Sequence, residues 1–452
     1  MLKTDELTIL QIQDMYQKKK ISIRELVAAY LDRISLYDQG SGKLNSILEV
    51  NPDALEVAAS LERDKSNFNS RLYGIPVLLK DNYDTADRMH TSAGSLALAD
   101  SYAAQDADIV KILRQKGAVI IGKTNMTEFS NSMSNGMKAG YSSRGGQVKS
   151  PYHINADPSG SSTGSAVAVS ANFCAASFGT DTSGSIISPA IKNGIVGFCP
   201  SNGTLSTKGI IPVSFTLDTA GPMTRTVMDA VIIYSELNGA YISEDDLNIA
   251  DLTIGVNQTN IIHLSAEEHG MLTSILKELE QSGMELTSLY LPDIPKDHLV
   301  KIQRYEFKYS INKYLSNLPV KYPIHSLQDL IEFNNSNSNQ TLKYGQSIFL
   351  EVEENTKGDL SELVYKQLLR DREKVKNDVL ETINNYDACI MSQNDYVMQY
   401  IGLPMITLPC GSDKDGMPYG LCLCSDQNDK LLKIAHQLEC LVGHRVTPNL
   451  CI

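Results

Sequence analysis

The sequence predicts an α/β fold in which helices and strands are arranged in layers. Short apolar runs typical of buried strands alternate along the chain with amphipathic runs typical of helices, and this alternation characterises layered α/β proteins. The 452 residues suffice for one or two domains, and 42% hydrophobic with 21% charged residues is an ordinary globular balance. No internal repeat interrupts this pattern.

The chain opens with segments that predict a helical layer. Residues 6–37 predict two amphipathic helices, and Ser22 with Glu25 forms a Ser-x-x-Glu capping box at the start of the second. Residues 44–50 predict a strand, and residues 52–63 predict a third helix. We expect this layer to pack outside the core. The sequence leaves open whether it also contributes to a dimer surface, so monomer and homodimer are both compatible with it.

The later elements continue the alternation. Helices are predicted at residues 108–116, 166–176, 266–282 and 430–441. Strands are predicted at residues 74–80, 118–121, 252–256, 285–291, 386–391 and 404–409. The polar tract from Asn334 to Gln340 predicts an exposed loop.

The composition argues against several classes of function. A net charge of −13 without a dominant basic patch argues against a nucleic-acid partner. The cysteines form no Cys-x-x-Cys motif and the histidines show no metal-ligand spacing, so we expect free thiols, no metal and no cofactor. The first residues are charged, and no apolar run approaches the roughly 20 residues that span a bilayer. We therefore expect no signal peptide, no membrane span and a cytoplasmic location.

Two clusters rich in Ser and Gly, about one helix length apart, are the centre of the functional interpretation. They cover residues 158–165 and 179–189 and are separated by a run of small residues. Consecutive N–H groups in such loops can converge on an anion. A hydroxyl among converging N–H donors is what acyl transfer requires, although such clusters taken alone are more often ordinary turns.

The stretch from residue 74 to residue 82 strengthens the catalytic interpretation. Its apolar run ends at Lys80, directly before a polar turn, which predicts a buried strand whose last residue faces a site. Burial would lower the pKa of Lys80 and let it act as a neutral base. The alternative is a lysine that extends to water from a strand end. We expect burial to dominate and the adjacent Asp81 carboxylate to point elsewhere.

Together these segments resemble the amidase signature family, and most of all its peptide-amidase-like branch. The matching motifs occur in the family's order and cover most of residues 60–230; they are residues 74–82, 122–129, 160–165, 179–189 and 194–197. The resemblance implies a single α/β/α domain with a large mixed central sheet covered by helices on both faces. This domain comprises an N-terminal helical layer (1–65), the signature core (66–230) and the rest of the sheet with variable substrate-pocket helices (231–452).

The resemblance also implies roles for particular residues. By position Ser185 matches the family nucleophile, Ser161 matches the cis-serine that follows a cis Gly160–Ser161 bond, and Lys80 matches the base. We expect hydrogen bonds to link the three side chains in a chain. The backbone N–H groups expected to hold the oxyanion are those of Thr182, Ser183, Gly184 and Ser185.

Two further residues are expected to support this triad, and three depart from the family pattern. Ser162 is expected near the lysine, and Asp181 is expected to tie down the nucleophile loop. Ile187 stands where many members have arginine, which argues against the amidotransferase A-subunit branch. Ser159 and Thr163 replace smaller residues of the first loop.

The predicted function is an amidase that hydrolyses a carboxylic amide C–N bond to a carboxylate and ammonia or an amine through an acyl-serine intermediate. Peptide C-terminal amides and small amides are the substrate classes considered, and no nucleic acid is expected as a partner. Two alternatives stay open. One is an amidotransferase A-type subunit that supplies ammonia within a complex, and the other is a non-catalytic amidase-like binding protein.

Overall fold

Eleven strands in the described part of the chain form one mixed sheet. The computed structural model describes residues 4–40, 43–64, 69–242, 247–259, 261, 264–292, 294–392 and 395–450. In spatial order the strands are β1 (Ile47–Val50), β3 (Val119–Thr124), β2 (Pro76–Lys80), β6 (Ala176–Asp181), β8 (Thr219–Thr224), β7 (Val196–Cys199), β12 (Met405–Ser412), β13 (Pro418–Cys424), β11 (Ala388–Met391), β9 (Thr253–Asn257) and β10 (Glu285–Leu289). A separate short ribbon pairs β4 (Tyr141–Ser142) with β5 (Gly146–Gln147).

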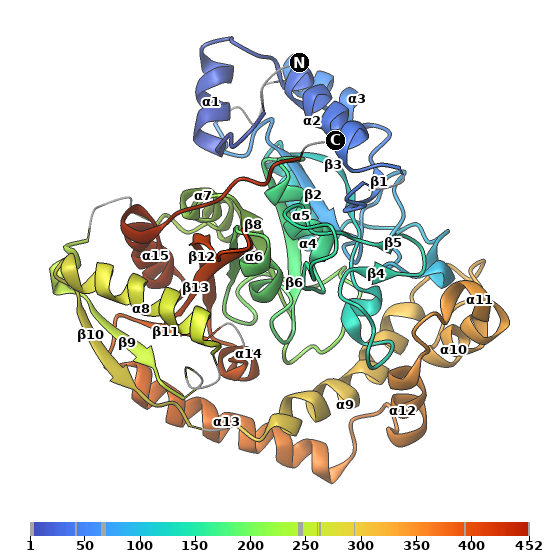
Figure 1. Cartoon of the computed structure of the whole chain (residues 1–452). Coiled ribbons are helices and arrows are strands. Elements are labelled where there is room, and N and C mark those ends of the chain that lie inside the picture. Colours follow the sequence, from blue (N-terminus) through green and yellow to red (C-terminus); the bar gives the residue numbers. More distant parts are fainter. Residues whose placement is uncertain are drawn as a thin grey trace.

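Helices surround the sheet (Figure 1). In chain order they are α1 (Ile9–Gln17), α2 (Ile23–Tyr37), α3 (Ala54–Arg63), α4 (Asp108–Gln115), α5 (Thr163–Ser170), α6 (Ile187–Lys192), α7 (Val227–Asn238), α8 (Ala266–Gln281), α9 (Lys296–Leu315), α10 (Leu327–Ser336), α11 (Ser338–Thr341), α12 (Ser347–Asn355), α13 (Leu363–Ile383), α14 (Val397–Ile401) and α15 (Asn428–Val442). Short 3-10 turns occur at Leu96–Leu98, Glu128–Asn131 and Ile249–Asp251. None of the described helices is long and apolar enough to cross a bilayer.

Each face of the sheet packs against its own cluster of apolar side chains. Successive residues of a strand belong to the two clusters in turn. In β13, Leu421 and Leu423 belong to a large core cluster that includes α7 and α15. Their neighbours Cys422 and Cys424 belong to a second cluster that includes α6, α13 and α14. Because successive side chains of a strand point to opposite faces, helices cover both faces of this sheet. The predicted α/β/α fold class is confirmed.

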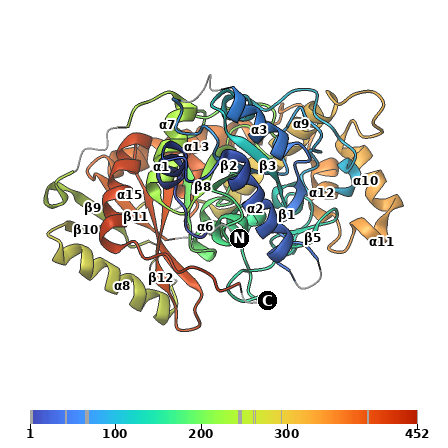
Figure 2. The ribbon, with the colours of Figure 1, turned by 90° about the horizontal axis from the view of Figure 1, so that it is seen from above.

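The N-terminal helices lie together at one end of the molecule in Figure 1, and the edge strand β1 links them to the sheet by pairing with β3. Capping boxes at Thr8 and Ser22 begin α1 and α2. Figure 2 shows that the two chain ends lie close together. An ion pair joins them there, since Arg445 Nε lies 2.8 Å from a carboxylate oxygen of Glu6.

Two predictions from the sequence were wrong in detail. The polar tract from Asn334 to Gln340 is largely exposed, as predicted, but it is helical, because it forms the end of α10 and most of α11. Asn334 itself is buried, and its side-chain amide donates to Gln346 at 3.0 Å. This hydrogen bond takes the place of the bond to water that the amide would make in an exposed loop. The helix predicted at residues 166–176 begins and ends earlier, because Asn172 adopts a left-handed φ of 61° and turns the chain into β6.

Candidate active site

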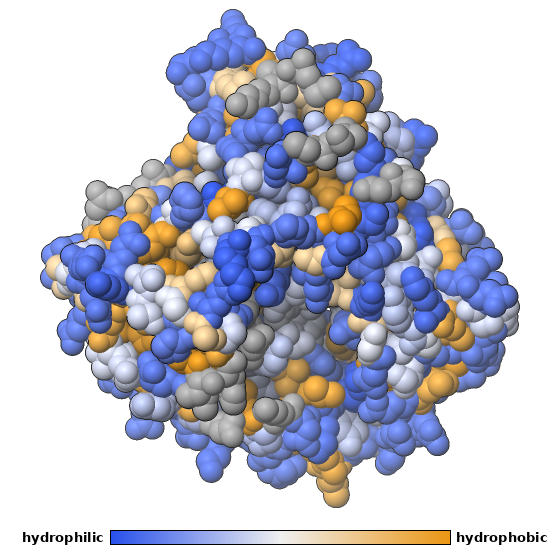
Figure 3. Space-filling model, in the orientation of Figure 1, coloured by the Kyte–Doolittle hydropathy of each residue, from blue (hydrophilic) through white to orange (hydrophobic). Residues whose placement is uncertain are grey.

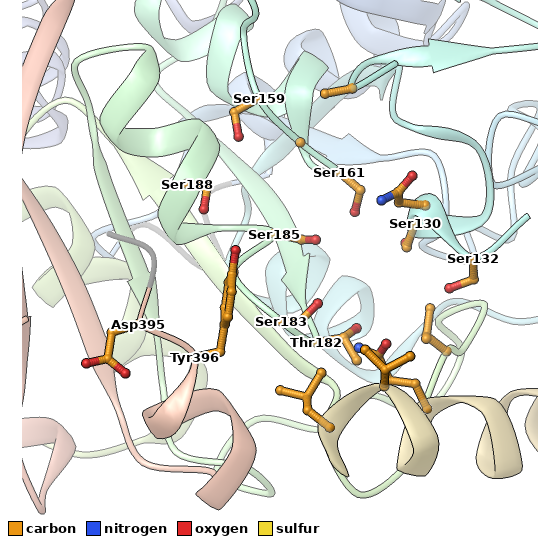
Figure 4. A pocket seen from close by; sticks show the side chains of 18 of the residues that line it. Ser130, Ser132, Ser159, Ser161, Thr182, Ser183, Ser185, Ser188, Asp395 and Tyr396 are labelled. Carbon is orange, nitrogen blue, oxygen red and sulfur yellow. The ribbon is translucent and has the colours of Figure 1, made fainter. Parts of the chain in front are cut away.

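Ser161 and the predicted oxyanion loop from Thr182 to Ser185 line a cavity of about 1080 Å³. The other predicted residues, Lys80, Ser162 and Asp181, are buried outside its lining. The cavity opens in the middle of the molecular face seen in Figure 3. One wall comes from both Ser/Gly clusters, including Ser161 and Ser185. Another wall is largely apolar and comes from α9 and the segments before it; it includes Leu264, Leu291, Ile294, Leu299 and Val300. Figure 4 shows the hydroxyl groups of Ser161 and Ser185 directed into the same part of the cavity.

Lys80 is the last residue of β2, which lies between β3 and β6, and it is fully buried. Its Nζ lies 2.8 Å from Ser161 Oγ, 3.0 Å from Ser162 Oγ and 2.8 Å from Thr180 Oγ1. The strand therefore places the lysine against Ser161, which lines the cavity, and does not release it to water.

Burial lowers the pKa of Lys80 to about 7, although the carboxylates of Asp181 and Asp218 oppose this shift. The adjacent Asp81 is not among the groups that shift it. Its carboxylate instead accepts hydrogen bonds from Ser92 and from the Gly94 N–H. The side chain of Asp81 thus points away from the lysine, as we expected from the sequence.

The first Ser/Gly cluster is held against the second by direct hydrogen bonds. The bond between Gly160 and Ser161 is cis. Ser162 N–H donates to the Ser185 carbonyl at 3.2 Å, and Ser162 Oγ donates to the Thr180 carbonyl at 3.0 Å. Ser162 therefore contacts the lysine, the strand before the second cluster and the second cluster itself.

The three residues that depart from the family motif are each accommodated by their immediate surroundings. Ser159 has a left-handed φ of 58°, and the hydroxyl of Thr163 donates to its carbonyl at 2.7 Å. Ile187 is buried in the apolar cluster with α13 and α14, where an arginine would have no water around it. The departures from the family motif are thus matched to their surroundings in this chain.

Asp181 organises the nucleophile loop. Its carboxylate accepts hydrogen bonds from the N–H groups of Gly184 and Ile186, each at 2.6 Å, and from that of Ile187 at 3.3 Å. Gly184 has a φ of 102°, which favours glycine. Because the Gly184 N–H is engaged inside the loop, it is not available as the oxyanion donor expected from the sequence.

The N–H groups of Thr182, Ser183 and Ser185 have no acceptor among the described residues. The hydroxyl of Ser185 likewise has no hydrogen-bond partner within the part of the chain that the structure describes. Of the expected chain, the link between Lys80 and Ser161 is present, whereas the link between Ser161 and Ser185 is not formed in this structure.

Sequence reasoning missed a pair of buried carboxylates behind this loop. Asp218 accepts a hydrogen bond from the Thr182 hydroxyl at 2.7 Å and from the N–H groups of Val213 and Ser214. Glu306 of α9 accepts from the Ser214 hydroxyl at 2.5 Å. No motif marks either acid, because the bond from Thr182 to Asp218 and the bond from Ser214 to Glu306 each join residues far apart in the sequence. Burial raises the pKa of Asp218 to about 6.

Comparisons with known proteins show what this chain is similar to. The family model described as amidase matches residues 25–395. A probable amidase of Arabidopsis thaliana is 37% identical over 96% of this chain and 90% of its own length. An amidase family protein from Bacillus anthracis superimposes with a TM-score of 0.91 at 35% identity, covering 99% of this chain and 93% of the other. A peptide amidase from Stenotrophomonas maltophilia gives a TM-score of 0.89 at 31% identity, covering 99% of both chains.

Proposed function

The chain belongs to the amidase family and is an amidase, and we propose that Lys80, Ser161 and Ser185 carry out its amide hydrolysis. The observation that carries the proposal is the buried Lys80 Nζ, held 2.8 Å from the Oγ of Ser161, a residue that lines the cavity. A lysine with a pKa near 7 is neutral in a large fraction of molecules at neutral pH, so it can accept a proton.

In the proposed reaction, neutral Lys80 takes the proton of Ser161 while Ser161 takes that of Ser185. Ser185 Oγ then attacks the amide carbonyl carbon and forms a tetrahedral intermediate. The hydrogen bond from Ser185 to Ser161 is expected to form when substrate fills the cavity, because catalytic hydrogen bonds often tighten only in the complex.

The negative oxygen of that intermediate would be held by the N–H groups of Thr182, Ser183 and Ser185, which the protein leaves without acceptors. The proton returns through Ser161 to the amide nitrogen, the C–N bond breaks, and ammonia or an amine leaves. Water then attacks the acyl ester on Ser185 and releases the carboxylate, with Lys80 again accepting the proton.

We further propose that the substrate is an extended amide such as a peptide with a C-terminal amide. The cavity of about 1080 Å³ lies at the upper end of small-molecule pockets, which span about 300–1,000 Å³. A small aliphatic amide would leave most of this volume unoccupied. The similarity to a peptide amidase supports the same substrate class.

Ammonia release from a panel of peptide amides, small aliphatic amides and aryl amides tests this proposal, with the Ser185→Ala variant as the matched control. We expect peptide amides to have the highest kcat/KM and the variant to be inactive on every member. Release from none of the amides by the purified chain, with activity restored by added subunits, would instead favour an amidotransferase A-type subunit.

A further inference from the structure

The two ends of the cavity carry different polar groups. Figure 4 shows Ser130 and Ser132 at one end and Asp395 at the other, with Ser161 and Ser185 between them. At the Asp395 end the carboxylate already has donors, since it accepts from the Asn257 side chain at 2.6 Å. Polar groups that are free to bind a ligand are therefore expected at the opposite end of the cavity, near Ser130 and Ser132.

Arg304 of α9 lies at the end of the cavity that contains Ser132. It is the one lysine or arginine among the described residues that line the cavity. Its ion-pair partner is Glu351 of α12, and the N–H of Ile348, in the first turn of α12, donates to the Met133 carbonyl. These contacts place the arginine beside the loop that carries Ser132.

The guanidinium of Arg304 is poorly satisfied by the protein. Its side chain is only 16% exposed, yet no described residue accepts a hydrogen bond from it. Nε is buried without a partner, and the nearest carboxylate oxygen, from the half-exposed Glu351, is 3.6 Å away, beyond hydrogen-bond distance. Burial lowers the pKa of Arg304, but the group stays charged at neutral pH.

Its neighbours are also unpaired. Ser132 is 6% exposed, but its hydroxyl has no hydrogen-bond partner in the described part of the chain, and the same holds for the half-buried side chains of Ser130 and Gln303, which also line the cavity. Buried polar groups normally have partners, so the unpaired Nε of Arg304, beside cavity-lining donors that the protein leaves free, indicates that a ligand supplies the acceptor.

We propose that Arg304 binds a carboxylate of the substrate and makes this enzyme selective for amides that carry an acidic side chain. This inference rests on the proposed function, because it concerns the substrate of the same cavity. The planar guanidinium matches a carboxylate through two parallel hydrogen bonds, which a neutral carbonyl group cannot provide. Arg304 is thus a specificity-determining residue that takes no part in the bond-breaking steps.

The test compares tripeptide amides in which one residue at a time is either glutamate or its γ-methyl ester, with ammonia release as the readout. For at least one position we expect wild type to prefer the free acid by about tenfold or more in kcat/KM, in line with a charge-assisted pair. Arg304→Gln should bring this ratio close to one while kcat/KM for the ester stays within about twofold.

Glu351→Gln is the matched control, because it removes the ion-pair partner but keeps the arginine. This variant should retain the preference for the acid. The inference is overturned if wild type shows no preference, if Arg304→Gln lowers both substrates equally, or if Glu351→Gln loses the preference as well.

A failure of the proposed function is distinguishable from a failure of this inference. If wild type hydrolyses no amide in any panel, calorimetric binding of the acid and ester peptides to wild type and to Arg304→Gln replaces turnover as the readout. Tighter binding of the acid that disappears in Arg304→Gln would support the inference even then, and equal binding of both peptides would overturn it.

Discussion

The chemistry depends on what surrounds Lys80, and a second buried lysine shows why. The Nζ of Lys80 contacts three hydroxyl groups, and a hydroxyl can donate or accept. The equally buried Lys123 instead contacts the backbone carbonyls of Tyr83 and His90 at 2.7 and 2.9 Å, and carbonyls only accept. Lys80 also lies 3.5 Å from the Thr180 carbonyl, and Lys123 also contacts the Thr91 hydroxyl at 3.2 Å. Most partners of Lys80 can therefore donate a hydrogen bond to a neutral amine, whereas only one partner of Lys123 can.

Lys80→Met should reduce kcat by at least about 10³, because general base catalysis typically contributes 10²–10⁴ and no other described base contacts Ser161. Methionine fills much of the same volume, so the far-UV circular dichroism spectrum should be unchanged. Steady-state ammonia release from a peptide amide is the measurement. Turnover within tenfold of wild type would contradict the role of Lys80.

The pH dependence should follow the same lysine. Burial places the pKa of Lys80 at about 7, and the reactive form is the unprotonated one, so kcat/KM should rise with pH through about 7 and level off above it. Asp218 also titrates near this range, at about 6. Because the Asp218 carboxylate raises the pKa of Lys80, Asp218→Asn should move the midpoint to lower pH. A flat profile from pH 5.5 to 8.5 would be inconsistent with a lysine base.

At the scale of elements, the nucleophile loop is fixed at both ends. Asp181 at the end of β6 gathers the N–H groups of Gly184 and Ile186, and Asp218 holds the Thr182 hydroxyl from the other side. Glu306 connects the same region to α9, whose earlier turns line the cavity. A loop held in this way presents its N–H groups in fixed directions, which oxyanion binding requires.

A double-mutant cycle tests the hydrogen bond between Thr182 and Asp218. Thr182→Val and Asp218→Asn should each lower kcat by about tenfold with little change in KM, since a hydrogen bond to a charged group is worth about 1.5–3 kcal/mol. The double variant should be no slower than the slower single variant, because both changes remove one interaction. Fully additive losses would mean that the two residues act separately.

In the whole molecule, Arg445 joins the N-terminal and C-terminal segments of the chain to each other and to the core. Arg445 contacts Glu6 and also donates to the carbonyls of Gly194 at 2.7 Å and Ser170 at 2.8 Å. The buried Arg225 donates to the carbonyl of Cys174 at 2.7 Å. These arginines satisfy carbonyl groups at the ends of the core elements, so they stabilise the fold at a distance from the cavity.

Arg445→Met should lower the free energy of unfolding by about 2 kcal/mol, because a partly buried carboxylate and two carbonyls lose a charged donor. Urea denaturation measures this loss, and activity at 25 °C should be unchanged. Lys414→Met removes an exposed ion pair with Glu267 and is the matched control, for which we expect no measurable change. Equal losses of unfolding free energy in the two variants would contradict the stabilising role of Arg445.

Site residues that belong to contiguous motifs could be predicted from the sequence, whereas residues whose partners come from distant segments could not. Lys80 and Ser185 belong to contiguous motifs, so their likeness to a family was visible without a structure. Asp218, Glu306 and Arg304 are isolated in the sequence and acquire partners only when distant segments fold together. The helical structure between Asn334 and Gln340 was missed because this tract has no hydrophobic periodicity, and the hydrogen bond from the Asn334 side chain to Gln346 links residues that no local pattern connects.

Ser185 is the proposed nucleophile, and identifying the residue that a fluorophosphonate modifies tests this assignment directly. After reaction, intact-mass and peptide mass spectrometry should locate a single adduct on Ser185, and Ser185→Ala should remain unmodified. Ser161→Ala should react more slowly but at the same residue. An adduct on Ser161 in wild type, or undiminished labelling of Ser185→Ala, would contradict the account.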